Sequence, residues 1–148
     1  MLVKYLCNDG EQIITSNLER IDTSPQGVLG SGMTESSGVF TFPSTGIYQI
    51  IYTMSYQSQT GAYTGAIIRG STDGFSSSDV VLARAYDRIQ GGGDTDGGTF
   101  NVTTLYDVTN TSNNKVKFGF QSNGTSADLE YSSSINITTM TFIRFGDT

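Results

Sequence analysis

The 148-residue sequence contains no histidine and a single cysteine, Cys7. Without histidine, Ser-His-Asp and Cys-His catalysis, ordinary zinc sites and a histidine proton switch are all excluded. One cysteine cannot form an intramolecular disulfide, so we interpret Cys7 as a small buried apolar residue. No glycine-rich loop has the spacing that cradles a phosphate group. The sequence therefore predicts no catalytic residues, no cofactor and no metal site.

Charged residues are also scarce, at 15% against about 25% in an average soluble domain. The net charge of −6 has the wrong sign for collecting phosphates, so we expect no nucleic-acid partner. No apolar run approaches the roughly 18 residues needed to span a membrane, and Met1–Asp9 lacks the layout of a signal peptide. We therefore expect a soluble protein that is made in the cytoplasm and has no membrane partner.

Short runs of β-branched and aromatic residues, bounded by Gly, Asn, Asp or Ser, recur about every 8 to 12 residues. This rhythm predicts an all-β fold: a two-sheet sandwich of about ten strands that forms one domain over residues 1–148. Residues 24–37 are expected to be a loop, and residues 17–22 either a strand or a helical turn. Residues 100–108 and 116–120 are expected to pair as a hairpin. The expected strands are 1–7, 12–15, 39–42, 47–56, 63–69, 80–86, 100–108, 116–120, 129–131 and 135–145.

The strand at 47–56 has apolar residues on both faces. Tyr48, Tyr52 and Tyr56 share one face with other apolar residues, whereas Ile47 and Ile51 lie on the opposite face. A strand with two apolar faces is typical of the centre of a sheet. The pattern therefore predicts a central strand, one face of which packs against another subunit.

Two groups of acidic residues are weak candidates for chemistry. Asp128 and Glu130 lie on the same side of a strand, as a glycosidase acid pair would, but alternating acids are common on exposed strands. Asp94 and Asp96 could offer oxygen ligands to calcium together with the acids of the 70–79 loop, Asp73 and Asp79. Their spacing matches no complete calcium-binding loop, so a solvated turn is the favoured interpretation.

A third candidate is a polar and aromatic patch for a sugar or a protein. Its members would be Tyr63, Tyr86, Arg69, Arg84 and Arg88. The alternative interpretation is that the tyrosines pack in the core and the arginines form salt bridges, and this one is favoured.

One motif is specific enough to suggest a family. The pattern Gly-x-Phe-Thr-x-Pro-x-x-Gly-x-Tyr is filled in order by Gly38, Phe40, Thr41, Pro43, Gly46 and Tyr48. This motif resembles the signature of the jelly-roll superfamily of complement component one-q heads and tumour necrosis factor. Residues 117–120 and 141–146 look like the penultimate and last strands of that family. Asn113-Asn114 replaces the usual Gly-Asp, and a collagen stalk or membrane anchor is absent.

The resemblance implies a ten-stranded jelly roll that forms a homotrimer. It places inner-sheet aromatics around the threefold axis, and we assign the following residues to this interface: Tyr48, Tyr52, Tyr56, Phe118, Phe120 and Phe142. The sequence leaves open which of them face the axis and which face the internal core, because a shift of one residue in register exchanges the two faces.

Stand-alone acidic members resemble bacteriophage virion components. The resemblance therefore implies a non-enzymatic structural protein of the virion, made in the host cytoplasm: a homotrimeric capsid decoration, or cement, protein whose partners are the major capsid protein or other virion proteins. The alternative is the head of a phage tail fibre or spike that binds a receptor or a surface glycan through the loops 70–79 and 91–98. We favour decoration because the first strand begins at Met1, without a trimeric shaft before it.

Overall fold

The structure is a computed structural model that describes residues 2–7, 10–21, 24–27, 29–58, 63–88, 96–123, 127–132 and 135–147. Every regular element in these residues is a β-strand, which confirms the all-β prediction. None of the described residues forms a helix long and apolar enough to cross a membrane. The strands are β1 (Leu2–Cys7), β2 (Gly10–Ile13), β3 (Thr34–Ser36), β4 (Val39–Thr41), β5 (Gly46–Ser58), β6 (Tyr63–Ser71), β7 (Val80–Arg88), β8 (Asp96–Val108), β9 (Lys115–Asn123), β10 (Ala127–Ser132) and β11 (Thr139–Gly146).

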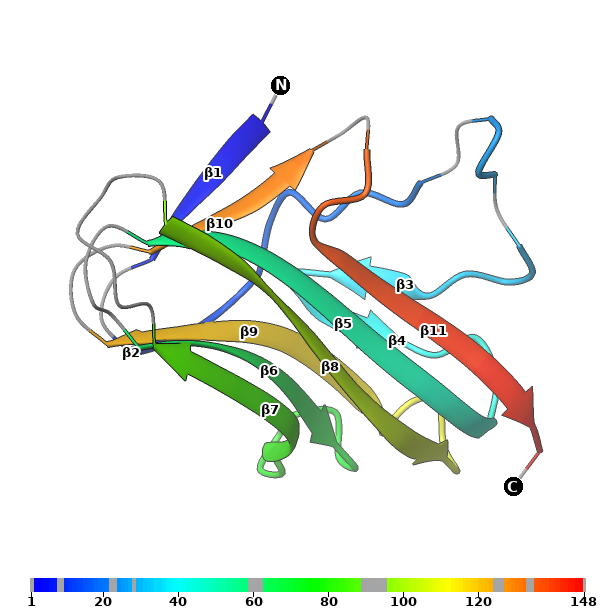
Figure 1. Cartoon of the computed structure of the whole chain (residues 1–148). Coiled ribbons are helices and arrows are strands. Elements are labelled where there is room, and N and C mark those ends of the chain that lie inside the picture. Colours follow the sequence, from blue (N-terminus) through cyan, green and yellow to red (C-terminus); the bar gives the residue numbers. More distant parts are fainter. Residues whose placement is uncertain are drawn as a thin grey trace.

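The strands form two antiparallel sheets that pack as two layers (Figure 1). The first sheet has the order β1-β10-β5-β11, and β8 pairs with the other edge of β5. The second sheet has the order β3-β4-β9-β6-β7, and β2 also pairs with β9. The strand β5 pairs with β8 over its full length and with β10 and β11 on its other side. It is therefore the central strand that the sequence predicts.

The family-like motif around β4 and β5 depends on two glycines. Gly38 has a φ of 81°, and a Cβ there would lie 2.2 Å from the carbonyl oxygen of Ile14. Gly46 has a φ of 135°, and a Cβ there would lie 2.3 Å from the carbonyl oxygen of Gly146. Any other residue would be strained at either position and would also collide with backbone. The motif thus brings β4 and the start of β5 close to neighbouring strands.

Four expectations differ from the structure. The expected loop at 24–37 contains β3, which pairs with β4. The last strand begins at Thr139 rather than at residue 135, and residues 17–21 form neither helix nor strand, while Asp22 lies outside the described residues. The expected hairpin of 100–108 with 116–120 is wrong, because β8 lies in the first sheet and β9 in the second. The apolar residues of both strands contribute to the same core, from opposite sheets.

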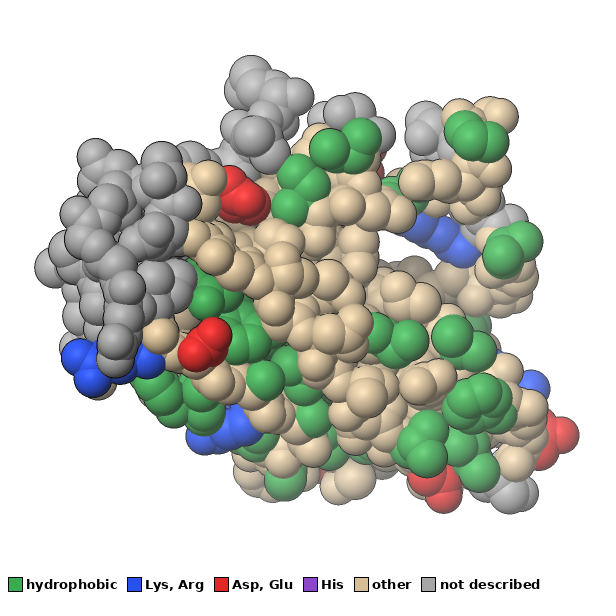
Figure 2. Space-filling model, viewed as in Figure 1, with side chains coloured by type: hydrophobic (Ala, Val, Ile, Leu, Met, Phe, Trp, Pro, Cys, Tyr) green, Lys and Arg blue, Asp and Glu red, His purple; other side chains and the backbone are tan. Residues whose placement is uncertain are grey.

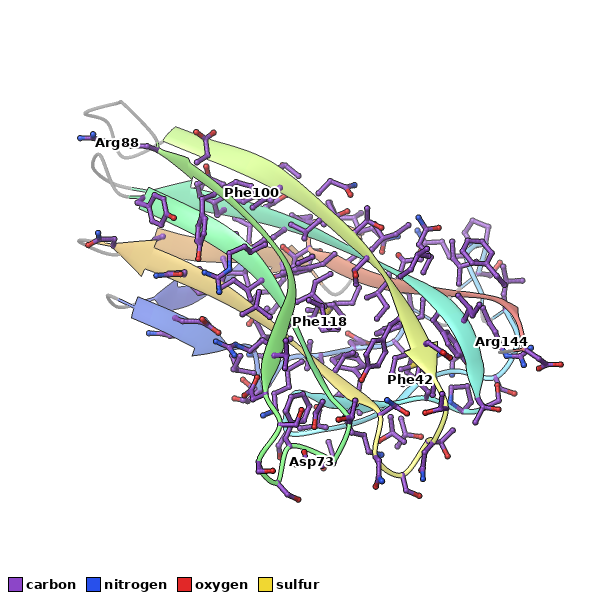
Figure 3. All side chains as sticks on the ribbon, turned by 90° about the horizontal axis from the view of Figure 1, so that it is seen from below. Phe42, Asp73, Arg88, Phe100, Phe118 and Arg144 are labelled. Atoms are coloured by element: carbon purple, nitrogen blue, oxygen red, sulfur yellow. The ribbon has the colours of Figure 1, made fainter. Side chains whose placement is uncertain are left out.

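Aromatic rings from both sheets fill the space between the layers (Figure 3). Phe118 on β9 packs against Tyr52 on β5, with ring centroids 5.2 Å apart. Phe42, which follows β4, packs against Tyr48 at 4.7 Å and Tyr106 at 5.7 Å. Offset and edge-to-face aromatic pairs each contribute about 0.5–1.5 kcal/mol beyond the burial of their area. The core therefore consists of one aromatic layer to which both sheets contribute.

Candidate functional site

The aromatic residues assigned to the trimer interface lie in the interior of one chain. Five of them have small exposed fractions: Tyr48 3%, Tyr52 0%, Tyr56 3%, Phe118 0% and Phe120 1%. Phe142 is half-buried, and its ring centroid lies 5.8 Å from that of Phe118. Side chains that their own chain covers have no surface left for a partner. The structure therefore corrects this assignment for the five buried residues, which complete the internal core; Phe142 packs against that core and is only partly covered.

The opposite side of the first sheet is the surface that β5, β8 and β11 present outward, and we call it the β5–β8–β11 face. Its upper part is a ladder of uncharged polar side chains. The Ser55 and Thr99 hydroxyls lie 3.1 Å apart, and the Asn101 amide donates to the Thr53 hydroxyl at 3.4 Å. Cross-strand pairs of this kind stabilise a sheet by fractions of a kcal/mol each. The ladder gives the face a polar but neutral centre.

The lower part of the same face is apolar. Leu105 on β8 and Ile143 on β11 flank Gln49 on β5 in the register of the sheet, and Ile47 lies one pair further along β5. Figure 2 shows apolar side chains gathered over the lower right ends of these strands. The exposed fractions are 38% for Ile47, 65% for Leu105 and 42% for Ile143, and 64% for Phe145 at the end of β11. We call these four residues the apolar cluster.

Charge is almost absent from the β5–β8–β11 face. Among the described outward side chains of these three strands, Asp107 is the single charged residue, and it lies at the apolar end opposite Ile47. Beyond these strands, the neighbouring β10 places Asp128 and Glu130 on the same side of the sheet, opposite Gln57 and Ser55. So little charge on the three strands is unusual for an exposed surface on a chain with a net charge of −6. A neutral face with an apolar end is suited to contact with another protein surface.

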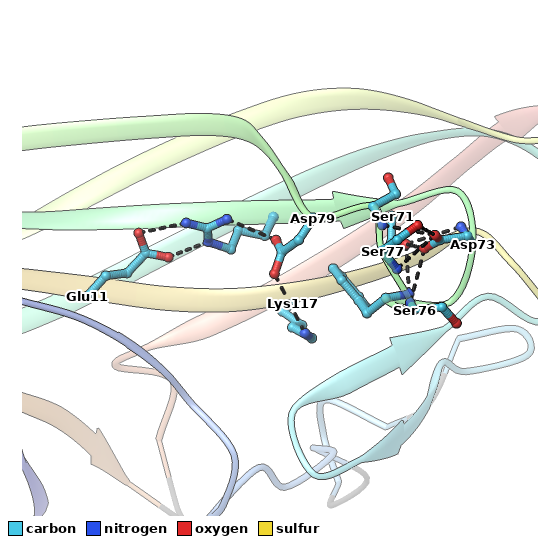
Figure 4. A network of polar contacts seen from close by, with 10 residues as sticks. Glu11, Ser71, Asp73, Ser76, Ser77, Asp79 and Lys117 are labelled. Carbon is cyan, nitrogen blue, oxygen red and sulfur yellow. Dashed lines mark hydrogen bonds and ion pairs between the residues drawn. The ribbon is translucent and has the colours of Figure 1, made fainter.

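The 70–79 loop, which the sequence analysis names as part of a candidate recognition surface, is organised by Asp73. Its carboxylate accepts hydrogen bonds from the Ser71 and Ser77 hydroxyls at 2.8 and 2.6 Å, and from the backbone amides of Ser76, Ser77 and Ser78 (Figure 4). Donation from Ser77 and Ser71 holds the pKa of Asp73 well below its usual range. The carboxylate oxygens of Asp73 accept hydrogen bonds from the loop itself, so this residue stabilises the conformation of the loop.

The other acidic candidates belong to different parts of the chain. Asp128 and Glu130 lie on β10, between β1 and β5. Asp79 pairs with Arg69 at 2.9 Å, while Asp94 and the side chain of Asp96 lie outside the described residues. The described residues contain no group of three or more acidic or cysteine side chains placed to hold a metal ion. Within the described residues, Asp128 and Glu130 share one side of β10, while Asp73 and Asp79 belong to a separate loop of the second sheet.

The polar and aromatic patch proposed from the sequence is a real cluster. Tyr63 and Tyr86 stack with ring centroids 4.5 Å apart, and the carbon of the Arg84 guanidinium lies 5.4 Å from the centre of the Tyr86 ring. Burial raises the pKa of Tyr63, and the neighbouring Tyr86 adds to this shift. The tyrosines thus lie on the outer face of the second sheet and not in the core.

No protein-family model matches the chain, and a search of curated proteins found no match. Among solved structures, Eiger TNF from S. frugiperda superposes with a TM-score of 0.58, over 98% of this chain and 91% of that chain. The chain has a TNF-like jelly-roll fold. This confirms the fold expected from the motif at 38–48. The sequence identity is 9%, so the comparison describes the fold alone.

The sequence pattern anticipates only part of the apolar cluster. It places Ile47 on the second face of its strand, but it does not single out Leu105. One feature of the sequence could have identified Leu105. From residue 99 to residue 107 it is the one apolar residue among the outward positions of β8, and the others are Thr99, Asn101, Thr103 and Asp107. An apolar residue out of phase with its strand's core face marks a second contact surface.

Proposed function

We propose that this protein is a homotrimeric decoration protein of a viral capsid, which stabilises the shell without catalysing a reaction. The observation that carries the proposal is the neutral β5–β8–β11 face with its exposed apolar cluster. Its partners would be two further copies of the chain and the major capsid protein, and its location would be the capsid surface of the virion.

The composition of the face supports threefold self-association. In a closed symmetric assembly, a residue near the axis meets its own copies. A charged residue there would face two like charges, whereas neutral hydroxyl and amide groups can hydrogen-bond with their copies. The polar ladder is suited to the region near the axis. The apolar cluster is suited to the dehydrated centre of an obligate interface, which commonly exceeds about 2,000 Å² in total.

Stabilisation of a shell requires only that the trimer bind the assembled state more tightly than the free subunits. Such binding shifts the assembly equilibrium by mass action, as any ligand of a folded state does. A rigid sandwich is appropriate for this role, because little conformational freedom is lost when it docks.

The proposal is tested on virus particles that carry this protein. Particles assembled without it should release their genome at a lower temperature than complete particles, and added wild-type protein should restore the difference. Leu105→Asp protein should fail to restore it, because this change disrupts the apolar cluster. Val80→Asp protein, altered at an exposed position of the second sheet, should restore it. Equal heat resistance with and without the protein would refute the capsid role.

The second candidate, a tail-fibre or spike head that binds a receptor, is favoured by one observation: the tyrosine and arginine cluster on the outer face of the second sheet. Host-cell binding by the isolated protein, with no effect of the protein on capsid stability, would favour this candidate over decoration.

A further inference from the structure

The positive charge of the chain is concentrated on the outer face of the second sheet. Five of its eight Lys and Arg residues project outward there: Arg69 on β6, Arg84 and Arg88 on β7, and Lys115 and Lys117 on β9. Two carboxylates lie on the same surface, Glu11 and Asp79. Five cations against two carboxylates leave a local charge of +3, although the whole chain carries −6. We call this surface the basic face.

The two carboxylates of the basic face are already engaged. Glu11 and Asp79 both pair with Arg69, and Asp79 also lies 3.9 Å from the ammonium of Lys117 (Figure 4). These contacts raise the pKa of Arg69, with the hydrogen bond from its guanidinium to Glu11 as the largest cause. In the described part of the chain, neither Arg84 nor Arg88 has a carboxylate partner, and Figure 3 shows Arg88 directed away from the body of the sandwich.

Beside these arginines, two aromatic rings are held in place. Tyr86 Oη accepts a hydrogen bond from Arg84 Nη1 and donates one to Gln121 Oε1, each at 2.7 Å. The ring of Tyr86 crosses β6 over Gly65, where a Cβ would lie 2.1 Å from the ring. Tyr63 stacks on Tyr86 at an interplanar angle of 26°. The glycine at position 65, the ring stacking and the two hydrogen bonds thus hold a partly exposed aromatic surface in place. Next to it lies a guanidinium that has no carboxylate partner among the described residues.

We infer that the basic face binds an acidic polysaccharide whose sugar units carry carboxylates, such as uronic acids. The tyrosine rings offer apolar faces to the C–H groups of a sugar ring and a hydroxyl edge for its polar groups. Arg84 donates to Tyr86 through Nη1 and keeps other N–H groups for a sugar carboxylate, which a guanidinium binds in bidentate geometry. A nucleic acid fits this surface less well. Tight binding of a nucleic acid requires a protein to neutralise many phosphates, and this protein has a net negative charge like that of the phosphates.

This inference is independent of the proposed capsid role, since the basic face belongs to the second sheet and the β5–β8–β11 face to the first. Both surfaces can therefore be occupied at once. In the proposed trimer, three copies of the basic face would bind one polymer with higher avidity than a single copy.

The test measures binding of the purified protein to oligogalacturonate and to a neutral cello-oligosaccharide of the same length, at low ionic strength. The acidic oligosaccharide should bind and the neutral one should not, and binding should weaken with added salt. Arg84→Gln should weaken binding about tenfold or more, because it removes a charge-assisted contact. Arg144→Gln changes the net charge equally but lies on β11 of the first sheet, so it should leave the affinity unchanged.

A second pair of variants tests the rings. Tyr63→Ala should weaken binding, and Tyr63→Phe should retain most of it, with circular dichroism spectra that match the wild type. The inference is overturned by absence of binding at low salt or by equal losses for Arg84→Gln and Arg144→Gln. It is also overturned if single-stranded DNA of similar length binds more tightly than the oligogalacturonate. None of these results bears on capsid stability, so each proposal can fail separately.

Discussion

The substitution Leu105→Asp is the most direct perturbation of the apolar cluster. Complete burial of a leucine side chain contributes about 1.5–3 kcal/mol. Because 65% of Leu105 is exposed in the single chain, its burial in a trimer would contribute about 1–2 kcal/mol per subunit. Three subunits give about 3–6 kcal/mol, which weakens association by about 100-fold to 10,000-fold. The buried aspartate adds a desolvation penalty of several kcal/mol per carboxylate.

Sedimentation velocity distinguishes the outcomes. Wild-type protein should sediment as a trimer, and Leu105→Asp should sediment as a monomer with an unchanged far-ultraviolet circular dichroism spectrum. The matched control is Val80→Asp, because Val80 is 57% exposed but lies on β7 in the second sheet; this variant should remain trimeric. A monomeric wild type, or a Leu105→Asp protein that stays trimeric, would refute the reasoning.

Three further predictions concern the fold. Thr64→Val should raise the free energy of unfolding by about 1 kcal/mol in urea titrations, since the buried Thr64 hydroxyl has no described hydrogen-bond partner; a fall would contradict this. Tyr106→Phe should lower it by about 1–3 kcal/mol, because the Tyr106 hydroxyl donates to the Ser71 carbonyl oxygen at 2.6 Å and accepts from the Asn114 amide; an unchanged midpoint would contradict this. The folded pKa of Asp73 lies below its ordinary value of 3.8, so its stabilisation is present above about pH 4 and is lost as the pH falls further; acid titration of Asp73→Asn should lack that loss.

The sequence predicts the fold class well because alternation is a local signal. In β5, residues 48, 50, 52, 54 and 56 are apolar or aromatic at every second position, and the structure buries all five. The motif at 38–48 also identifies the jelly roll, since Gly38 and Gly46 occupy positions where a Cβ would collide with backbone. The alternation depends on neighbouring residues alone, so one sequence carries it, whereas the two glycines are required by contacts with the distant residues Ile14 and Gly146.

The surfaces are less predictable, because which face is covered depends on strands distant in sequence. Aromatic residues predict burial but do not say whether the covering atoms come from the same chain. The core of this chain needs Tyr52 and Phe118 from different sheets, so these residues are not available to an interface. The hairpin prediction for β8 and β9 fails for a related reason. A short turn can connect strands that belong to different sheets as readily as strands that pair with each other.

Electron cryo-microscopy of virus particles assembled with and without this chain would show both the proposed trimer and its location. We expect threefold-symmetric density on the outer surface of the capsid shell, into which three copies fit with their β5–β8–β11 faces together. That density should be absent from particles made without the chain. Density at the tip of a tail fibre or spike, or three copies that meet through other surfaces, would contradict the account.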